Sequence, residues 1–243
     1  MTIQIHPNHE QLSHAAAEAF VETVRNNPHA VICVSTGDTP TRTYQVVVEM
    51  AKSSAIDFSH ITLIALDEWV GIPPSNPGSC YAYLHQHLID PLNLRPEQFR
   101  LFDAQATDLD AECQKTSELI LKIGGLDLVV AGVGMNGHIG FNEPGTPLDK
   151  TCHVVELEPI TREVGQKYFT GTMSLQYGIT VGLKPILQSK TLMLLASGEK
   201  KAPVMQQVLE GKPSIHCPAS LVQQHPNSIV LLDEASAALI KKG

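Results

Sequence analysis

The chain of 243 residues is poor in positive charge and has no long hydrophobic run. It holds 17 Lys and Arg against 25 Asp and Glu, a net charge of −8 that disfavours general binding to nucleic acid or to an anionic membrane surface. No apolar run reaches the ~18 residues that a membrane-spanning helix requires. We therefore expect no nucleic-acid partner and no membrane partner.

Cysteine is also sparse, with five residues scattered at positions 33, 80, 113, 152 and 217. Their spacing fits no metal motif, and their odd number does not suggest a disulfide framework. The first residues, MTIQIHPNHEQL, lack the basic and apolar regions of a signal peptide. These features predict a cytoplasmic protein with reduced thiols. Cys80 alone lies beside a candidate site segment, where a structural role is the ordinary expectation.

Predicted strands and helices alternate along the chain. Apolar runs predict strands at 30–34, 61–66, 128–131, 153–157, 178–181, 191–196 and 229–232. Helical spacing predicts helices at 10–26, 41–51, 81–88, 110–123, 161–169, 200–209 and from 234 onward. Such alternation implies parallel strands joined by right-handed crossovers. We predict a single domain over residues 1–243, an α/β three-layer sandwich with a mainly parallel, Rossmann-like central sheet.

Four glycines follow the apolar run 128–131, in the stretch DLVVAGVGMNGHIGFNEP (127–144). Glycine serves where backbone bends sharply or approaches a ligand closely. The carboxyl end of a parallel strand is the usual place for a ligand site in an open α/β sheet. This loop carries Asn136, His138 and Glu143, and a glutamate near a histidine can orient it for acid–base work. The alternative is a histidine that is hydrogen-bonded for structural reasons.

The same loop contains a dinucleotide-like pattern, because Gly132, Gly134 and Gly137 spell G-x-G-x-x-G. Nicotinamide binding requires the third glycine to open a helix whose N-terminus holds the pyrophosphate. The chain instead continues HIGFNEPG, which cannot sustain a helix. We expect no nicotinamide cofactor. We also expect no metal, because His138 has no second ligand at a recurring spacing.

Two further segments follow predicted strands. The first, S-T-G-D-T-P (35–40), offers hydroxyls, a flexible glycine and free N–H groups at a helix start, which suit a phosphate. Ser, Thr and Asp also cap helices for purely structural reasons. The second, L-D-E-W (66–69), places two carboxylates at a strand end, where alternate side chains point to opposite sides. A shielded Asp67 would have a raised pKa and could shuttle a proton; a helix cap or lysine partner is the alternative.

The chain resembles the glucosamine-6-phosphate deaminase (isomerase) family in three segments, which are S-T-G-D-T-P, L-D-E-W-V-G and G-M-N-G-H-I-G-F-N-E-P-G. The resemblance covers about residues 30–234, and the string H-I-G-F-N-E-P is its most specific part. It implies an enzyme that converts glucosamine or galactosamine 6-phosphate to the ketohexose 6-phosphate and ammonia, with no metal or organic cofactor.

The resemblance also implies residue roles. Asp67 would move a proton between C1 and C2 of the opened sugar. His138 would assist ring opening with Glu143 as its partner, and Asn136 would occupy a ring-opening position that is Asp in some members. The phosphate would be bound by the 35–39 loop, together with Lys167 and Lys200.

The residues of this phosphate site are Ser35, Thr36, Gly37, Asp38, Thr39, Lys167 and Lys200. Asp38 stands where members often have glycine, and we expect it to offer its N–H with its side chain turned outward. Lys167 stands where many have arginine, which gives a point charge in place of a bidentate fork. Arg162 is the substitute if that alignment shifts.

Two other functions fit part of this pattern. A 6-phosphogluconolactonase would share the fold and the phosphate loop, but resembles the chain less after His138. A non-catalytic sugar-phosphate sensor would need only the phosphate contacts.

The segment 146–155 is poor in positive charge, so we expect no activation by N-acetyl amino-sugar phosphates. The D-E-W-V-G-I-P-P segment of the chain is somewhat similar to the galactosamine-6-phosphate branch of the family. We expect the protein to be a monomer or a homo-oligomer.

Overall fold

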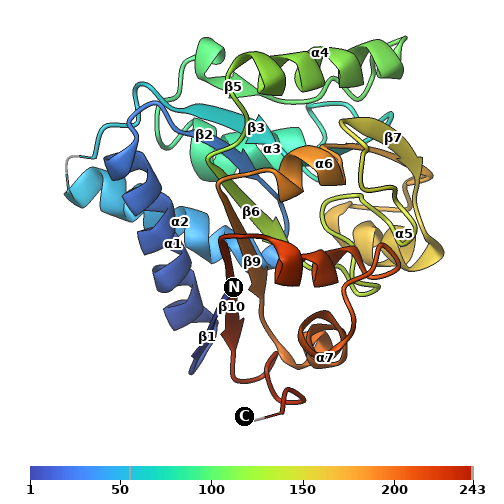
Figure 1. Ribbon diagram of the computed structural model, residues 1–243. Coiled ribbons are helices and arrows are strands. Elements are labelled where there is room, and N and C mark those ends of the chain that lie inside the picture. The colour runs from blue at the N-terminus through green and yellow to red at the C-terminus, as the bar shows by residue number, and fades with distance from the viewer. Residues whose placement is uncertain (55, 242–243) are drawn as a thin grey trace.

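The computed structural model describes residues 1–54 and 56–241, and a central β-sheet lies between helices (Figure 1). All neighbouring strands of this sheet are parallel, in the order β1-β10-β9-β6-β2-β3-β5. Their bounds are β1 Thr2–His6, β2 Val31–Val34, β3 Thr62–Ala65, β5 Phe99–Arg100, β6 Leu128–Gly132, β9 Thr191–Ala196 and β10 Ser228–Asp233. The prediction of a mainly parallel α/β fold is confirmed.

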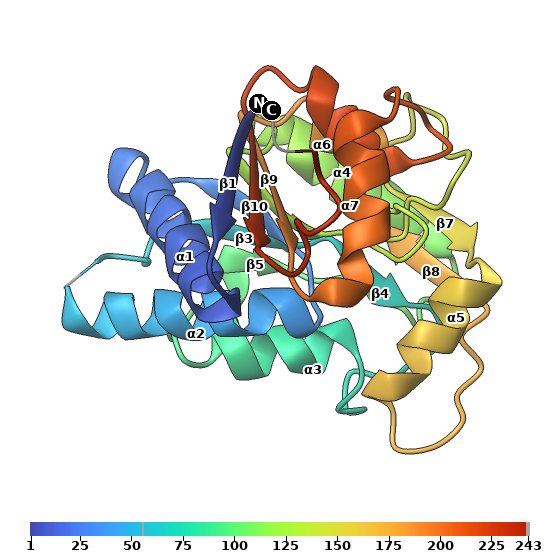
Figure 2. The same cartoon turned by 90° about the horizontal axis from the view of Figure 1, so that it is seen from below.

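Helices cover both faces of the sheet (Figure 2). One face packs against α1 (His9–Asn26), α2 (Asp38–Ser53), α3 (Cys80–Leu84) and a π-helical turn (His85–Ile89), and the other against α4 (Leu109–Lys122), α6 (Leu183–Leu187) and α7 (Ala202–Glu210). Consecutive strand residues point to opposite faces of the sheet. Ile32 belongs to the hydrophobic core that contains Phe20 of α1, whereas Cys33 belongs to the core on the other face, which contains Met205 of α7. Because strand side chains alternate, burial on both faces requires the continuous apolar runs that predicted these strands.

The first helix shows how local sequence sets an element. Asn8 caps α1 by accepting a hydrogen bond from the Gln11 N–H at 3.0 Å. Leu12, Phe20 and Val24 then fall on one face and are buried against the sheet. The predicted helix at 10–26 is therefore confirmed to within a residue.

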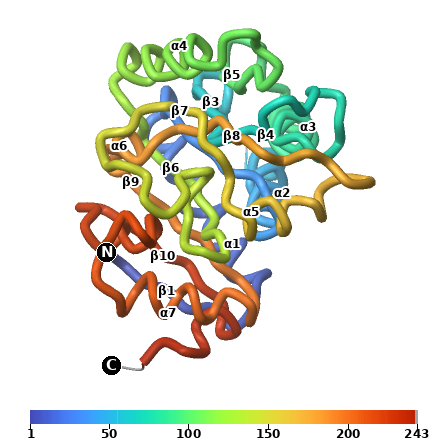
Figure 3. The backbone as a smooth tube through the Cα atoms, turned by 90° about the vertical axis from the view of Figure 1, so that its right-hand side faces the viewer, coloured from blue at the N-terminus to red at the C-terminus, as the bar shows by residue number. Residues whose placement is uncertain are grey.

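A second sheet was not predicted. It has three antiparallel strands in the order β4-β8-β7, formed by Asp67–Trp69, Tyr177–Thr180 and His153–Glu156. In Figure 3 these strands lie together beside α5 (Pro159–Gly165). The expectation of parallel strands is wrong for this part of the chain, because alternation with helices gives the order of elements and not their direction. A three-residue strand such as β4 is also too short to show a periodic pattern.

Leu66 joins the two sheets. Its N–H donates to Val34 O of the large sheet at 2.9 Å, and its carbonyl accepts from the Val181 N–H at 2.8 Å, just after β8. Leu66 is fully buried. The chain therefore passes from the parallel sheet into the antiparallel one at the residue before Asp67.

Three other expectations need correction. The helix predicted from position 234 is a series of turns, the helix at 161–169 is α5 followed by a 3₁₀ turn (Gln166–Tyr168), and β1 was missed. Four of the five residues of β1 are exposed, and its partner β10 lies at the opposite end of the chain, so local sequence gives little sign of it. The single domain stays a prediction. None of the described helices is both long and apolar enough to cross a bilayer.

Candidate active site

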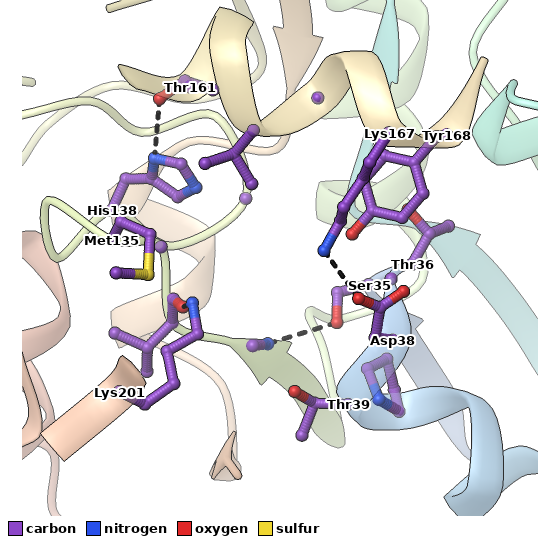
Figure 4. Close-up of a pocket in the computed structure, with 18 of the residues that line it drawn as sticks. Ser35, Thr36, Asp38, Thr39, Met135, His138, Thr161, Lys167, Tyr168 and Lys201 are labelled. Atoms are coloured by element: carbon purple, nitrogen blue, oxygen red, sulfur yellow. Dashed lines mark hydrogen bonds and ion pairs between the residues drawn. The ribbon is translucent and has the colours of Figure 1, made fainter. Parts of the chain in front are cut away.

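A pocket of about 970 Å³ lies where the carboxyl ends of β2, β6 and β9 meet α5 and β4. Figure 4 labels side chains around this space that come from the segments after β2, β6 and β9, from α5 and from the turn after α5. The lining includes residues 35–40, Asp67, His138, Lys167 and Lys200. Asn136 and Glu143 lie behind His138 and do not line the pocket, and neither does Arg162.

The loop after β2 has the shape of an anion cradle. Gly37 has φ +116°, a conformation that L side chains rarely adopt, and a Cβ there would lie 3.1 Å from the Tyr168 hydroxyl. Asp38 then opens α2, so the N–H groups of the first helical turn are free of intrahelical partners. Ser35 Oγ accepts from the Gly132 N–H at 3.2 Å and ties the cradle to the end of β6.

Asp38 differs from the expectation that its side chain turns away from the pocket. Its carboxylate Oδ2 lies 2.6 Å from Lys167 Nζ, and the pair faces across the pocket mouth (Figure 4). Both side chains are substantially exposed, so solvent screens the pair and its contribution to stability is small. Asp38 therefore adds negative charge to the rim of the cradle, and Lys167 offsets it.

Lys201 is a charged residue of the pocket that sequence reasoning missed. Its ammonium donates to the Val133 carbonyl at 2.5 Å and lines the pocket opposite the cradle, whereas its neighbour Lys200 is exposed at the rim. Burial, and then the nearby Lys167 charge, lower the pKa of Lys201 to about 8. The sequence S-G-E-K-K offered two adjacent lysines, and only the 3₁₀ turn Glu199–Lys201 decides which one faces inward.

The two adjacent carboxylates of β4 have opposite surroundings, as strand geometry predicts. Glu68 turns away from the pocket and accepts the backbone N–H groups of Trp69, Cys80 and Tyr81 at 2.7 to 2.9 Å. Asp67 lines the pocket and is 7% exposed. Burial, and then the charge of Glu68, raise the pKa of Asp67 to about 7. A carboxylate with such a pKa can take up and return a proton near neutral pH.

His138 is held by a carboxylate beneath it. Its Nδ1 lies 3.3 Å from Glu143 Oε2 and 3.2 Å from Thr161 Oγ1, while the other ring nitrogen points into the pocket (Figure 4). Asn136 Nδ2 donates to the same Glu143 oxygen at 2.7 Å. Although burial alone would raise it, hydrogen bonds from His138, Thr161 and Asn136 lower the pKa of Glu143. An ionised Glu143 favours hydrogen on Nδ1, which leaves Nε2 free to accept a proton.

The glycines of this loop make room for the histidine, and no helix follows them. A Cβ on Gly134 would lie 2.3 Å from the His138 ring, and one on Gly137 would lie 2.6 Å from Cys217 Sγ. The absence of a helix after Gly137 removes the dinucleotide interpretation of G-x-G-x-x-G. Within residues 1–54 and 56–241, no three His, Cys, Asp or Glu side chains lie close enough to hold a metal ion.

Residues 7–231 match the family described as glucosamine-6-phosphate isomerases/6-phosphogluconolactonase. The glucosamine-6-phosphate deaminase of Bacillus velezensis is 40% identical over 231 residues, which cover 95% of this chain and 96% of that protein. The structure of a monomeric glucosamine-6-phosphate deaminase is similar with a TM-score of 0.95 and 34% identity, covering 98% of this chain and all of the other.

A 6-phosphogluconolactonase from Trypanosoma brucei is also similar, with a TM-score of 0.79 over 99% of this chain and 98% of the other, but at 18% identity this likeness shows the fold alone. The chain belongs to the glucosamine-6-phosphate isomerase/6-phosphogluconolactonase family. Within that family it is an enzyme of the deaminase type, as the identity of 34 to 40% to deaminases shows.

Proposed function

We propose that this enzyme converts glucosamine 6-phosphate or galactosamine 6-phosphate to the corresponding ketohexose 6-phosphate and ammonia. The observation that carries the proposal is a single pocket that is lined both by Asp67 and His138 and by the residues of the anion cradle. A sugar phosphate has an anionic end and a reactive end, and this pocket offers groups for both. A lactonase needs only an activated water, whereas moving a proton between two carbons needs one group that acts first as base and then as acid, which a carboxylate with a pKa near 7 can do.

The phosphate is held by the cradle and two ammonium groups. The free N–H groups at the start of α2 and the hydroxyls of Ser35 and Thr39 suit its oxygens, and Thr36 lines the pocket between them. Lys167 and Lys201 supply positive charge from two other segments of the pocket wall. Lys200 lies at the exposed rim and contributes long-range attraction to the dianion.

Ring opening is assigned to His138. Its pocket-facing nitrogen takes the proton of the C1 hydroxyl and delivers it to the ring oxygen, which breaks the C1–O5 bond and exposes the aldehyde. Glu143 holds the imidazolium charge formed between these two transfers, and Asn136 fixes Glu143. Because Asn136 is neutral, Glu143 is the carboxylate on which His138 depends.

Proton migration is assigned to Asp67. Its carboxylate takes the C2 proton, which yields an enolamine with the negative charge on the C1 oxygen, and returns that proton to C1. A proton then passes from the C2 nitrogen to the C1 oxygen. The resulting C2 imine adds water and releases ammonia, so that sugar phosphate plus water gives ketose phosphate plus ammonia. The raised pKa of Asp67 suits both halves of this transfer, because the same group serves first as base and then as acid.

The test is ammonia release from the two amino-sugar phosphates in parallel, with 6-phosphogluconolactone as a third substrate and unphosphorylated glucosamine as a fourth. We expect ammonia from at least one phosphate, and loss of turnover with unphosphorylated sugar. Asp67→Asn should lower kcat by roughly 10³-fold or more. The matched control is Asp149→Asn, an exposed carboxylate outside the pocket, which should behave as the parent.

Three results would contradict the proposal. Hydrolysis of the lactone with no ammonia from either amino sugar would show that the site performs lactone hydrolysis and not deamination. An Asp67→Asn variant as fast as the parent would remove Asp67 from proton transfer. Binding of sugar phosphates with no turnover at all would leave a sensor.

A further inference from the structure

The Asp67 carboxylate has little to hold it. Among the hydrogen bonds of the residues that the structure describes, its side chain receives one, from Cys80 Sγ at 3.6 Å. The neighbouring Glu68, in contrast, receives three backbone N–H bonds. A carboxylate that must face one carbon of a substrate therefore depends for its orientation on a single thiol.

The thiol itself is firmly placed. Cys80 is 3% exposed and is the first residue of α3, whose N-cap is Ser79. Its backbone N–H donates to Glu68 Oε1 at 2.9 Å, and the next N–H, of Tyr81, donates to Oε2 at 2.7 Å. Glu68 thus clamps the start of α3, and this clamp holds the Cys80 side chain against Asp67.

The chemistry of the thiol suits a donor and not a nucleophile. Burial, and then the charges of Glu68 and Asp67, raise the pKa of Cys80 well above its usual value. The sulfur therefore keeps its hydrogen near neutral pH and can donate it to a carboxylate oxygen. Cys33 and Tyr44 are fully buried, and their pKa values are raised first by burial and further by the Asp67 charge, so they stay neutral as well.

A third residue completes the arrangement. Thr36 Oγ1 lies 3.2 Å from Cys80 Sγ, and Thr36 belongs to the anion cradle. A thiol has one hydrogen, so when Cys80 donates to Asp67 the Thr36 hydroxyl must be the donor to sulfur. The sulfur consequently connects the cradle to Asp67 through two successive hydrogen bonds.

We propose that Cys80 is a positioning residue that orients the Asp67 carboxylate toward the pocket and links it to the anion cradle through Thr36. The consequence for catalysis rests on the proposed deaminase function, but the orientation and titration of Asp67 do not. Loss of a donor to the ionised form raises the pKa of a carboxyl group. Replacement of the thiol therefore should leave Asp67 a weaker acid and less well placed.

The test is the titration of Asp67 in the free protein, followed by the ¹³C resonance of its carboxyl group and assigned by its loss in Asp67→Asn. We expect Cys80→Ala to raise the midpoint by about half a pH unit or more, because the one side-chain donor that Asp67 has among the described residues is lost. Cys80→Ser, which keeps a donor of similar size, should titrate at or below the parent value. Cys113→Ala removes an equally buried thiol of α4 and should change nothing.

Kinetics supply the second readout. In Cys80→Ala the acidic limb of the pH profile of kcat/KM should shift to higher pH, together with the Asp67 titration. The value of kcat should fall several-fold, and KM should change little. Cys80→Ser should restore the parent pH profile and the parent kcat. An unchanged Asp67 titration in a folded Cys80→Ala protein overturns the inference. If that variant does not fold, a Cys80→Ser midpoint above the parent value overturns it instead. Absence of ammonia release in the parent would count against the proposed function alone, because the titration needs no turnover.

Discussion

The Asp38 carboxylate lies 2.6 Å from the Lys167 ammonium, across the mouth of the pocket that we assign to the substrate phosphate. The phosphate must therefore share Lys167 with a carboxylate that is already present. The two negative groups repel each other at short range, and this repulsion opposes binding. Asp38 thus sets an upper bound on how tightly this site holds a dianion.

Removal of this charge should tighten binding. Asp38→Asn should lower KM for the sugar phosphate about fivefold, the value of roughly 1 kcal/mol that one screened charge contributes near a surface. The change should shrink as salt is added, because the pair is exposed. Asp110→Asn, which removes an exposed acid from the first turn of α4 outside the pocket, is the control and should leave KM unchanged. A KM that rises in Asp38→Asn would show that the carboxylate assists binding.

Alkaline pH should weaken substrate binding through Lys201. Burial and the charge of Lys167 lower its pKa to about 8, so this ammonium loses its proton as the pH rises through that value. KM should therefore increase above pH 8 while kcat holds. Lys201→Arg, which stays charged, should remove the increase, and Lys200→Ala at the exposed rim should preserve it. KM measured from pH 6.5 to 9.5 in the three proteins decides the matter, and a flat parent profile would contradict it.

Asp67 should make the folded protein less stable at neutral and alkaline pH. Burial raises its pKa from the usual 3.8 to about 7, so the folded state holds a proton that the unfolded state releases between these values. The favourable contribution is fully present below about pH 4 and is lost as the pH rises through 7. The Asp67→Asn substitution should then increase the free energy of unfolding by about 2–4 kcal/mol at pH 8 and change it little at pH 4. Urea unfolding at the two pH values measures it, and equal gains would refute the assignment.

Glu143 should be needed for turnover and not for binding. Glu143→Gln removes the negative charge that stabilises the His138 imidazolium, so kcat should fall about 10²-fold or more. The KM for the sugar phosphate should change little, because Glu143 does not contact the phosphate site. The control is Glu156→Gln, an exposed position at the end of β7. Steady-state kinetics on both variants, with circular dichroism to verify folding, provide the measurement. A fall confined to KM would place Glu143 in binding instead.

The sequence allowed the parallel sheet to be predicted because β2, β3, β6 and β9 are buried on both faces and therefore appear as continuous apolar runs. It did not reveal the antiparallel sheet, because strand direction depends on contacts between residues such as Asp67 and Thr180, which are distant in sequence. The turns after 234 carry apolar residues at helical spacing, and spacing alone could not show that they do not form a helix.

The candidate site was predictable to the level of segments and less so to the level of side chains. The 35–39 loop, Asp67 and His138 share one pocket because parallel strands end at a common edge. The choice between Lys200 and Lys201 depends on the rotation of one 3₁₀ turn, which sequence does not fix. The bond between Cys80 and Asp67 joins two segments through the packing of α3 against β4, and composition gave no sign of it.

Leu66 connects the anion cradle to the Asp67 carboxylate through the backbone. The cradle belongs to the parallel sheet and Asp67 to the antiparallel one, and Leu66 is the hinge point between them, hydrogen-bonded to both. Its buried side chain would lie 3.0 Å from a Cβ built on Gly140, so Leu66 packs tightly against the Gly140 backbone. A substitution at Leu66, which does not line the pocket, would change the distance between the cradle and the Asp67 carboxylate through the backbone, and so offers a way to shift the enzyme toward shorter or longer sugar phosphates.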